Sequence, residues 1–533
     1  MSSSKHSWQY AVIILTGAAA VLPSLHMTPW QLVAQGLLAC LAVSYCAMAS
    51  YNLFIYPYYV SPLRHLPGPT DHHFLLGHTV KQFLSGDPRE PYVTWLKRWP
   101  KEPLIRFMGF GNSESLLVTS LDAFKEIYLP KSYTYIKPEF SKRLMAPVLG
   151  YGLIFQEGDE ARTQRKLISA LFGLTSIKRT ISTFQKKAKR ICQLFDQKIE
   201  NENGLVNVSS AWSSVALDVI SEFTLGIDFQ TTLTPSVFHE SYNQCFDSST
   251  FGCILIAIYA IFPAIRTFPL EENRKYKAAN ALVRSEIRKL IQMREAELAE
   301  KPLDSEDTPN VLTHMLLESK AMGHPLSEDQ ILQNILNFFA AGHETSATTM
   351  VWCTHMLTRH PDIQEKVRQE VTELITRKPN PDYYDLESLH YTDNVLKETL
   401  RLCSPGIVAA REPVHDVEIC GTIVPKGTPL VLMPTIVNRN PMIWGEDADE
   451  FRPERWDNLT GEASDPHAMT SFLMGPRSCI GRAFAMLEMK MILVEVMSKF
   501  ELEPAVEEKD IILVNPSPAL RVKGGLKVNV SRL

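Results

Sequence analysis

An uncharged N-terminal stretch limits what this 533-residue chain can fold into. Residues 6–63 contain no Asp, Glu, Lys or Arg, so we expect this stretch to lie in lipid. Its second half, residues 32–55, is long enough for a helix that crosses a bilayer core. Four tyrosines stand where an interfacial aromatic belt would place them: Tyr51, Tyr56, Tyr58 and Tyr59. The sequence therefore predicts a transmembrane helix ahead of a folded body.

The first half of the stretch, residues 11–25, leaves two interpretations open. It is either a second transmembrane helix or the core of a signal peptide, with the small residues 18–20 as the cleavage site. If both halves span the bilayer, Lys5 and Arg64 lie on the same side, and the turn between the two helices carries no Lys or Arg. The positive-inside rule then places the rest of the chain in the cytosol.

Composition excludes several classes of protein for the remainder of the chain. The net charge is -5 and charged residues make up 21%, so we expect no basic nucleic-acid-binding surface and no nucleic-acid partner. The nine cysteines are scattered and never form a C-x-x-C pair, which argues against a disulfide framework and against a zinc site. A reducing cytosolic environment fits this use of cysteine.

After the uncharged stretch, the hydrophobic pattern is mostly helical. A stiff proline-containing linker, residues 66–69, comes first. Apolar residues then recur at helical spacing, and short runs typical of strands appear at residues 104–107, 114–119 and 417–424. We predict that residues 1–60 are a membrane anchor with one or two transmembrane helices and that residues 61–533 are one catalytic domain. That domain is expected to be mainly α with a small β portion.

A long helix is predicted from Ser327 to Arg359. Ser327 and Gln330 form a capping-box pattern at its start, and its length would let it cross a domain. Its middle contains Gly342, which costs a helix up to about 1 kcal/mol relative to Ala. Two interpretations explain a glycine at this place: a functional site, or a tightly packed crossing with another helix.

A second helix, predicted over residues 392–403, carries Glu398 and Arg401. Their i,i+3 spacing places the carboxylate and the guanidinium on one face of the helix. Taken alone this pair says little, because many helices contain one.

A glycine-bracketed loop carries Cys479. Residues 472–481 read Phe-Leu-Met-Gly-Pro-Arg-Ser-Cys-Ile-Gly, and an apolar helix is predicted directly afterwards, over residues 483–500. The unpaired N–H groups and the positive dipole end of a helix N-terminus favour a thiolate. Gly475 and Gly481 let the backbone come close to a flat ligand. The loop is typical of a cysteine presented to a metal, whereas we interpret most of the other cysteines as small buried hydrophobes.

These motifs, in this order behind an anchor and a proline linker, resemble the cytochrome P450 family of the microsomal, class II type. The linker region, residues 61–69, looks most like fungal members. The resemblance implies a cytochrome P450 fold preceded by an N-terminal membrane anchor. It also implies that Cys479 is the axial thiolate ligand of the iron in haem b. Four more residues would contact this cofactor: Phe472, Gly475, Gly481 and Ala341.

The resemblance also assigns roles to acidic, basic and hydroxyl side chains. Thr345 would be catalytic, and Glu344 would link it to bulk protons as a general-acid relay. Glu398, Arg401 and Arg455 would form a buried structural network that holds the cysteine loop in place.

Three arginines would bind the two haem propionates, since guanidinium groups form bidentate pairs with carboxylates: Arg165, Arg411 and Arg477. Two positions depart from the family pattern. Ala161 stands where many members have Trp or His, and Asn438 replaces a common His. A propionate contact is therefore missing or supplied elsewhere, and a second minor contact is in doubt.

Family-level mapping places apolar substrate walls near Phe338, Val408, Ala409 and Pro518. Residues 251–262 form an apolar run too short to span a bilayer, and we interpret it as either a substrate entrance in the membrane surface or a buried core helix. The apolar walls and the fungal likeness favour a lipophilic substrate, a terpenoid or polyketide intermediate of secondary metabolism.

The implied activity is a haem-thiolate monooxygenase that inserts one oxygen atom from O2 into this substrate. The chain has no G-x-G-x-x-G unit and no room for fused flavin domains, so its electrons would come from NADPH through a separate NADPH–cytochrome P450 reductase. The expected location is the endoplasmic reticulum membrane, with the catalytic domain facing the cytosol. That acidic reductase would meet cations on the Cys479 side: Arg477, Arg482 and Lys490, with Arg162 and Lys166 nearby.

Two alternative functions stay open at this point. One is a haem-thiolate isomerase or dehydratase that needs no reductase, although such enzymes often lack the acid–hydroxyl pair that Glu344 and Thr345 provide. The other is a membrane-anchored protein whose haem senses a gas or is merely carried, for which a proton relay would serve no purpose.

Overall fold

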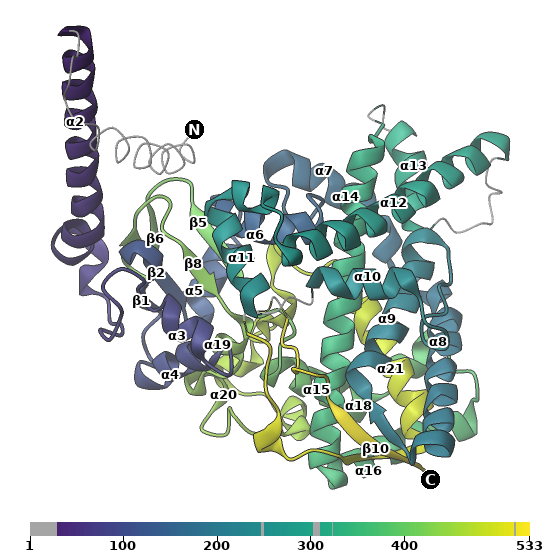
Figure 1. The fold of residues 1–533 in the computed structure, drawn as a ribbon. Coiled ribbons are helices and arrows are strands. Elements are labelled where there is room, and N and C mark those ends of the chain that lie inside the picture. The colour runs from purple at the N-terminus through teal and green to yellow at the C-terminus, as the bar shows by residue number, and fades with distance from the viewer. Residues whose placement is uncertain are drawn as a thin grey trace.

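The computed structural model describes residues 29–246, 250–301, 310–321, 323, 325–515, 517 and 519–533. Within these ranges the chain is mainly helical with a small β portion, as predicted. Figure 1 shows the largest sheet on one side of the body and most of the helices on the other, with the N-terminal helix α2 projecting away beside the sheet. The first apolar segment, residues 11–25, and its cleavage alternative lie outside the described residues.

The N-terminal helix consists of α2 (Pro29–Ser50) and a π-helical continuation, η1 (Tyr51–Val60). It therefore ends at Val60, beyond the predicted end at residue 55. Among the described residues, Val33–Val60 is the one helix that is long and apolar enough to cross a membrane, judged by length and composition.

Side chains of the folded body hold the end of this helix. Pro57 lies inside η1 and has no backbone N–H to donate. Asn112 donates to the carbonyl of Leu53 over 3.0 Å, and Arg106 donates to the carbonyl of Pro57. The last turns of the N-terminal helix are thus joined to the segment between residues 104 and 118.

The strands are β1 (Leu104–Met108), β2 (Glu114–Val118), β3 (Tyr135–Ile136), β4 (Leu205–Asn207), β5 (Ala409–Pro413), β6 (Val417–Ile419), β7 (Thr422–Val424), β8 (Leu430–Leu432), β9 (Phe500–Pro504) and β10 (Lys527–Arg532). The largest sheet has the order β1-β2-β8-β5-β3, in which only β2 and β8 run parallel. A second sheet has the order β4-β10-β9. The predicted run at 417–424 is a hairpin of β6 and β7, because Cys420 and Gly421 both have positive φ, at 45° and 77°, as a tight hairpin turn requires.

The helices of the first half are α3 (Thr79–Leu84), α4 (Glu90–Arg98), α5 (Leu121–Tyr128), α6 (Glu139–Leu149), α7 (Gly158–Ser169), α8 (Leu174–Glu202), α9 (Val208–Leu225), α10 (Val237–Phe246), α11 (Thr250–Ile261) and α12 (Glu271–Glu300). Those of the second half are α13 (Val311–Ala321), α14 (Glu328–Phe339), α15 (Thr345–Arg359), α16 (Pro361–Arg377), α17 (Tyr383–Glu387), α18 (His390–Leu402), α19 (Pro434–Asn438), α20 (Pro441–Trp444) and α21 (Arg482–Met497). The largest apolar core lies between α8, α9, α15 and α21.

The long central helix is present as predicted, built from α14, a π-helical turn η6 (Ala340–Glu344) and α15. Its capping box is formed in full: the N–H of Gln330 donates to the Ser327 hydroxyl over 3.2 Å, and the N–H of Ser327 donates to the Gln330 side chain over 2.9 Å. The π turn falls on the segment that contains Gly342, and such turns recur at functional sites.

Gly342 itself serves the packing of this helix against α9. A Cβ atom at Gly342 would lie 2.5 Å from Cδ1 of Ile220, far inside van der Waals contact. The helix-crossing interpretation therefore accounts for Gly342. Of the two neighbouring small residues, Ala341 and Gly342, Ala341 is the exposed one.

Candidate functional site

The loop that carries Cys479 is built from short helical turns that end at α21. The N–H of Cys479 donates to the carbonyl of Phe472 over 2.8 Å, which closes the loop. Gly475 has a φ of 61°, and a Cβ there would lie 2.5 Å from the carbonyl oxygen of Tyr128. Both its backbone conformation and its close contact with α5 therefore require glycine at this position.

Cys479 is enclosed by protein and yet has an accessible face. Its side chain is exposed to solvent. Nevertheless, burial among surrounding protein atoms raises the pKa of the Cys479 thiol, while the N–H of Gly481 and the guanidinium groups of Arg165 and Arg482 act in the opposite direction. A sulfur atom placed in this way can bind a metal of a ligand that lies against the loop.

Gly481 gives independent support for such a ligand. Its φ is -91°, and a Cβ there would approach only Phe172, at an ordinary contact distance of 3.6 Å. The described protein atoms do not require glycine at this position. The absence of a side chain leaves room for the close approach of a flat group that the sequence predicts.

Two of the predicted propionate-binding arginines lie close to Tyr128. Arg411 is buried, with its guanidinium 5.3 Å from the Tyr128 ring. Arg477 donates to the carbonyl of Gln156 over 3.2 Å and pairs with Glu157, but its buried Nε has no hydrogen-bond partner among the described atoms. A buried donor without a partner costs free energy, so the Nε of Arg477 is available to donate to an acceptor on a ligand.

Arg165, the third predicted arginine, approaches the cysteine loop from α7. Its Nη2 donates to the hydroxyl of Ser478 over 3.3 Å. Ala161, one turn earlier on α7, is buried and offers no donor. The structure therefore brings Arg165 to the residue next to Cys479.

Lys137 joins this group of cations, and the sequence analysis missed it. Its side chain is 11% exposed and its Nζ lies 2.9 Å from the Glu157 carboxylate. Burial lowers the pKa of Lys137 to about 7, and the positive charges of Arg411 and Arg477 contribute to this shift. One carboxylate, Glu157, pairs with both Lys137 and Arg477, so the group suits a ligand that brings further carboxylates. A single lysine ahead of α6 carries no pattern that marks it in the sequence.

On the central helix, the predicted catalytic pair occupies the π turn and the start of α15. The hydroxyl of Thr345 donates to the carbonyl of Ala341 over 2.5 Å. Glu344 is 14% exposed, and one of its oxygens lies 4.0 Å from Nε of Arg521. Arg521 comes from the segment before β10, far away in the sequence, and no motif pointed to it.

Glu398, Arg401 and Arg455 meet in a fully buried network, as the sequence motifs required. Arg401 donates to both oxygens of Glu398, over 2.8 and 2.7 Å, and Arg455 donates to Glu398 over 3.2 Å. The Nε1 of Trp456 donates to the same carboxylate over 3.0 Å. Arg455 has a second acid partner, Asp447, at 2.8 Å, so each charge has an opposite charge.

Asn438 connects this network to the cysteine loop. Its carbonyl accepts a hydrogen bond of 2.8 Å from Arg401. Its side-chain oxygen accepts from the N–H and the hydroxyl of Thr470, both over 2.9 Å, and its side-chain nitrogen donates to Ser471 over 2.8 Å. The amide that replaces the family's common His therefore fixes the segment just ahead of Phe472.

Comparison with known proteins identifies the family of the chain. The cytochrome P450 family model matches residues 67–528. The chain belongs to the cytochrome P450 family. It is 30% identical to cytochrome P450 monooxygenase sphH of Aspergillus fumigatus over 497 residues, which cover 90% of this chain and 88% of sphH. It is 28% identical to cytochrome P450 monooxygenase FUM15 of Gibberella moniliformis over 544 residues, covering 90% of each chain.

Haem b is the cofactor of this family, and the residues of this cytochrome P450 fit it. The donor set combines an accessible cysteine sulfur with buried cations that lack sufficient carboxylate partners. A glycine that the protein alone does not need lies two residues after the cysteine. A flat iron ligand with two carboxylates satisfies all three features.

The substrate-wall candidates differ in how much surface they offer. Val408 is 48% exposed and Ala409 is half-buried at the start of β5. Phe338 is 6% exposed and lies in an apolar cluster, with its ring stacked near that of Phe172 at a centroid distance of 6.2 Å. Pro518 lies outside the described residues.

Two cations expected on the surface of this cytochrome P450 near Cys479 are not available there. Lys490 is buried and bonded to Asp393 over 2.8 Å, and Arg477 points inward to Glu157. Their exposure depends on acidic residues far away in the sequence, which the local pattern does not show. The remaining cations of the predicted set are exposed: Arg162, Lys166 and Arg482.

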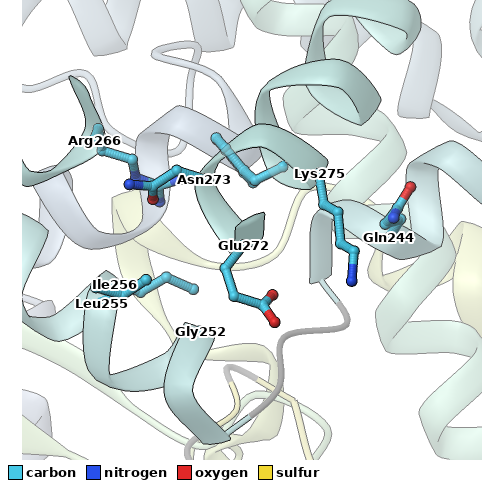
Figure 2. A pocket seen from close by; sticks show the side chains of 9 residues that line it. Gln244, Gly252, Leu255, Ile256, Arg266, Glu272, Asn273 and Lys275 are labelled. Atoms are coloured by element: carbon cyan, nitrogen blue, oxygen red, sulfur yellow. The ribbon is translucent and has the colours of Figure 1, made fainter. Parts of the chain in front are cut away.

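A pocket between α10, α11 and α12 lies apart from all of these residues (Figure 2). Its volume of about 40 Å³ admits a few water molecules, far below the roughly 300–1,000 Å³ of a small-molecule site. The guanidinium of Arg266 lies 3.9 Å from the ring centroid of Tyr276, which also lines the pocket. None of the predicted site residues lines it, so it is not the active site.

Proposed function

We propose that this cytochrome P450 monooxygenase binds haem b through Cys479 and oxidises a lipophilic small molecule with electrons delivered from NADPH by a separate reductase. The observation that carries the proposal is the Cys479 loop: an enclosed cysteine with an accessible sulfur, bordered by cations that have too few carboxylate partners. When bound, the haem supplies the redox chemistry that activates O2.

The residues of the chain supply the binding and the protons. The sulfur of Cys479 would hold the iron, and Lys137, Arg411 and Arg477 would bind the propionates. Thr345 donates its hydroxyl hydrogen to the helix carbonyl of Ala341, so the lone pairs of its oxygen remain able to accept a hydrogen bond. Glu344, next to Thr345 on the same helix, would link this site to bulk protons.

Substrate class and location extend this proposal. The helix α11 was interpreted either as a membrane-surface entrance or as a core helix, and its exposed apolar side chains favour the entrance: Phe251, Ile254 and Ile258 are 54%, 47% and 37% exposed. An apolar entrance suits a lipophilic terpenoid or polyketide intermediate of secondary metabolism.

The helix Val33–Val60 would anchor the enzyme in the endoplasmic reticulum membrane with its catalytic domain in the cytosol. The exposed Arg162, Lys166 and Arg482 would meet an acidic NADPH–cytochrome P450 reductase.

The decisive experiment uses the purified holoprotein in two steps. The difference spectrum of the reduced, carbon monoxide-treated protein reports thiolate ligation, and NADPH consumption with added reductase reports oxygen activation. We expect Cys479→Ala to abolish the thiolate spectrum and Thr345→Ala to keep it while electrons are diverted into hydrogen peroxide. A thiolate spectrum without reductase-dependent NADPH consumption would favour the isomerase alternative. Iron held by nitrogen would refute the proposal.

A further inference from the structure

A chain of hydrogen-bonded side chains runs from the central helix through α9 to α10. His343, in the π turn η6, is completely buried, and its Nε2 lies 2.8 Å from the hydroxyl oxygen of Ser213 on α9. The same hydroxyl lies 3.2 Å from Nε2 of His239, in the first turn of α10. Three residues from three helices are thus joined by two hydrogen bonds.

The inner end of this line lies at the predicted catalytic acid. The Nδ1 of His343 has no hydrogen-bond partner among the described atoms, and it lies 3.8 Å from Oε1 of Glu344. This separation is longer than a hydrogen bond, so the last proton transfer of such a line requires the Glu344 side chain to move closer. The outer end, His239, is half-buried, so solvent reaches it.

One assignment of hydrogens satisfies both hydrogen bonds of this chain. With its hydrogen on Nε2, His239 donates to the Ser213 oxygen, and the Ser213 hydroxyl donates to Nε2 of His343. His343 then carries its hydrogen on Nδ1, the nitrogen that faces Glu344. All donors point in the same direction, from the surface toward the acid.

We propose that His239, Ser213 and His343 form a relay that returns protons from solvent to Glu344. The proposal rests on the proposed function, because it requires Glu344 to release protons during oxygen activation. The three are relay residues that act through Glu344.

Each group of the relay regains the number of protons with which it began. Once Glu344 is a carboxylate, His343 gives it the Nδ1 proton and takes the hydroxyl proton of Ser213 at Nε2. Ser213 takes the Nε2 proton of His239, and water supplies a new proton to the His239 ring. One proton has entered from solvent, each group carries the number of protons with which it began, and reorientation of the relay groups restores the starting tautomers.

The environment favours a relay over an ion pair. Burial lowers the pKa of His343 to about 3, with a contribution from Arg521, and burial lowers the pKa of His239 to about 4, with a contribution from His343. Both rings are therefore neutral near pH 7, and a neutral imidazole accepts on one nitrogen while it donates on the other.

The test uses Ser213, the link whose loss leaves both histidines and Glu344 in place. Pre-reduced holoprotein without added substrate is mixed with O2 and reduced NADPH–cytochrome P450 reductase, and the decay of its visible absorbance is followed in H2O and in D2O. We expect Ser213→Ala to slow this decay at least threefold and to enlarge the solvent isotope effect. Ser213→Thr, which keeps a hydroxyl, should restore the rate. Ser214→Ala, which removes the neighbouring hydroxyl on the same helix, is the control and should decay like the parent protein.

The outcomes separate this proposal from the proposed function. The relay is refuted if Ser213→Ala keeps its thiolate spectrum with carbon monoxide but decays at the parent rate with an unchanged isotope effect. If Ser213→Ala fails to fold, His239→Leu at the half-buried end replaces it, with the same expected slowing and the same refuting result. Failure of the proposed function would appear earlier, as a parent protein without the thiolate spectrum.

Discussion

Replacing Glu398 tests how strongly the buried charge network supports the site. Its carboxylate accepts five hydrogen bonds: two from Arg401, and one each from Arg455, Trp456 and the backbone N–H of Arg452. Glu398→Ala would leave two guanidinium groups in the core without this acceptor. Breaking a buried charge pair in this way costs about 3–5 kcal/mol.

The assay is the half-life of the thiolate signal at a fixed elevated temperature, because a protein of this size is expected to unfold irreversibly. Since about 1.4 kcal/mol corresponds to a tenfold change, we expect Glu398→Ala to shorten the half-life at least about tenfold. Glu454→Gln is the matched control, because Glu454 forms an exposed ion pair with Lys366 at 2.7 Å. That exposed pair is worth about 1 kcal/mol at most. Equal half-lives of the two variants would refute the reasoning.

Three further predictions concern other buried positions. Burial raises the pKa of Glu488 to about 8, so the folded state keeps a proton that the unfolded state releases, and stability falls as pH rises from about 4.5 to 8. Glu488→Gln should remove this slope of at most about 1.4 kcal/mol per pH unit, measured as thermal half-life at several pH values; an unchanged slope would contradict it. Gly342→Ala should destabilise the protein by about 1–3 kcal/mol through overpacking against Ile220, and the added change Ile220→Val should recover part of this loss in a double-mutant cycle. Lys137→Ala should speed the transfer of haem to excess apomyoglobin severalfold, whereas the exposed control Lys131→Ala should not, and equal rates would remove Lys137 from the haem site.

Features with local causes were predictable from the sequence. Ser327 and Gln330 marked the start of the central helix because a capping box needs only four consecutive residues. The cysteine loop was visible as a motif because its glycines and Cys479 lie within ten residues. The family resemblance supplied Arg455 as the third member of the Glu398 network, which spacing within one helix does not reveal.

Features that depend on distant partners were missed or wrong. Lys490 was expected on the surface, but Asp393 on another helix holds it in the interior. For Gly342 the sequence left a functional site and a packed helix crossing open, and the contact with Ile220 that favours the crossing comes from α9. Lys137 gained its role only where the fold placed it beside two arginines. Burial and pairing of this kind are properties of the tertiary structure, and a local pattern does not contain them.

The two faces of the candidate site are held by separate parts of the fold and joined in the core. The cysteine loop is fixed through Asn438 to the charge network of α18. The segment with Thr345 belongs to the central helix, whose position depends on the close crossing with α9. A buried hydrogen bond of 3.0 Å from Ser346 to Glu488 joins α15 to α21, the helix that follows Cys479. The residue after Thr345 is therefore bonded to the helix that begins at the cysteine loop, so this bond helps to fix the position of Thr345 relative to Cys479.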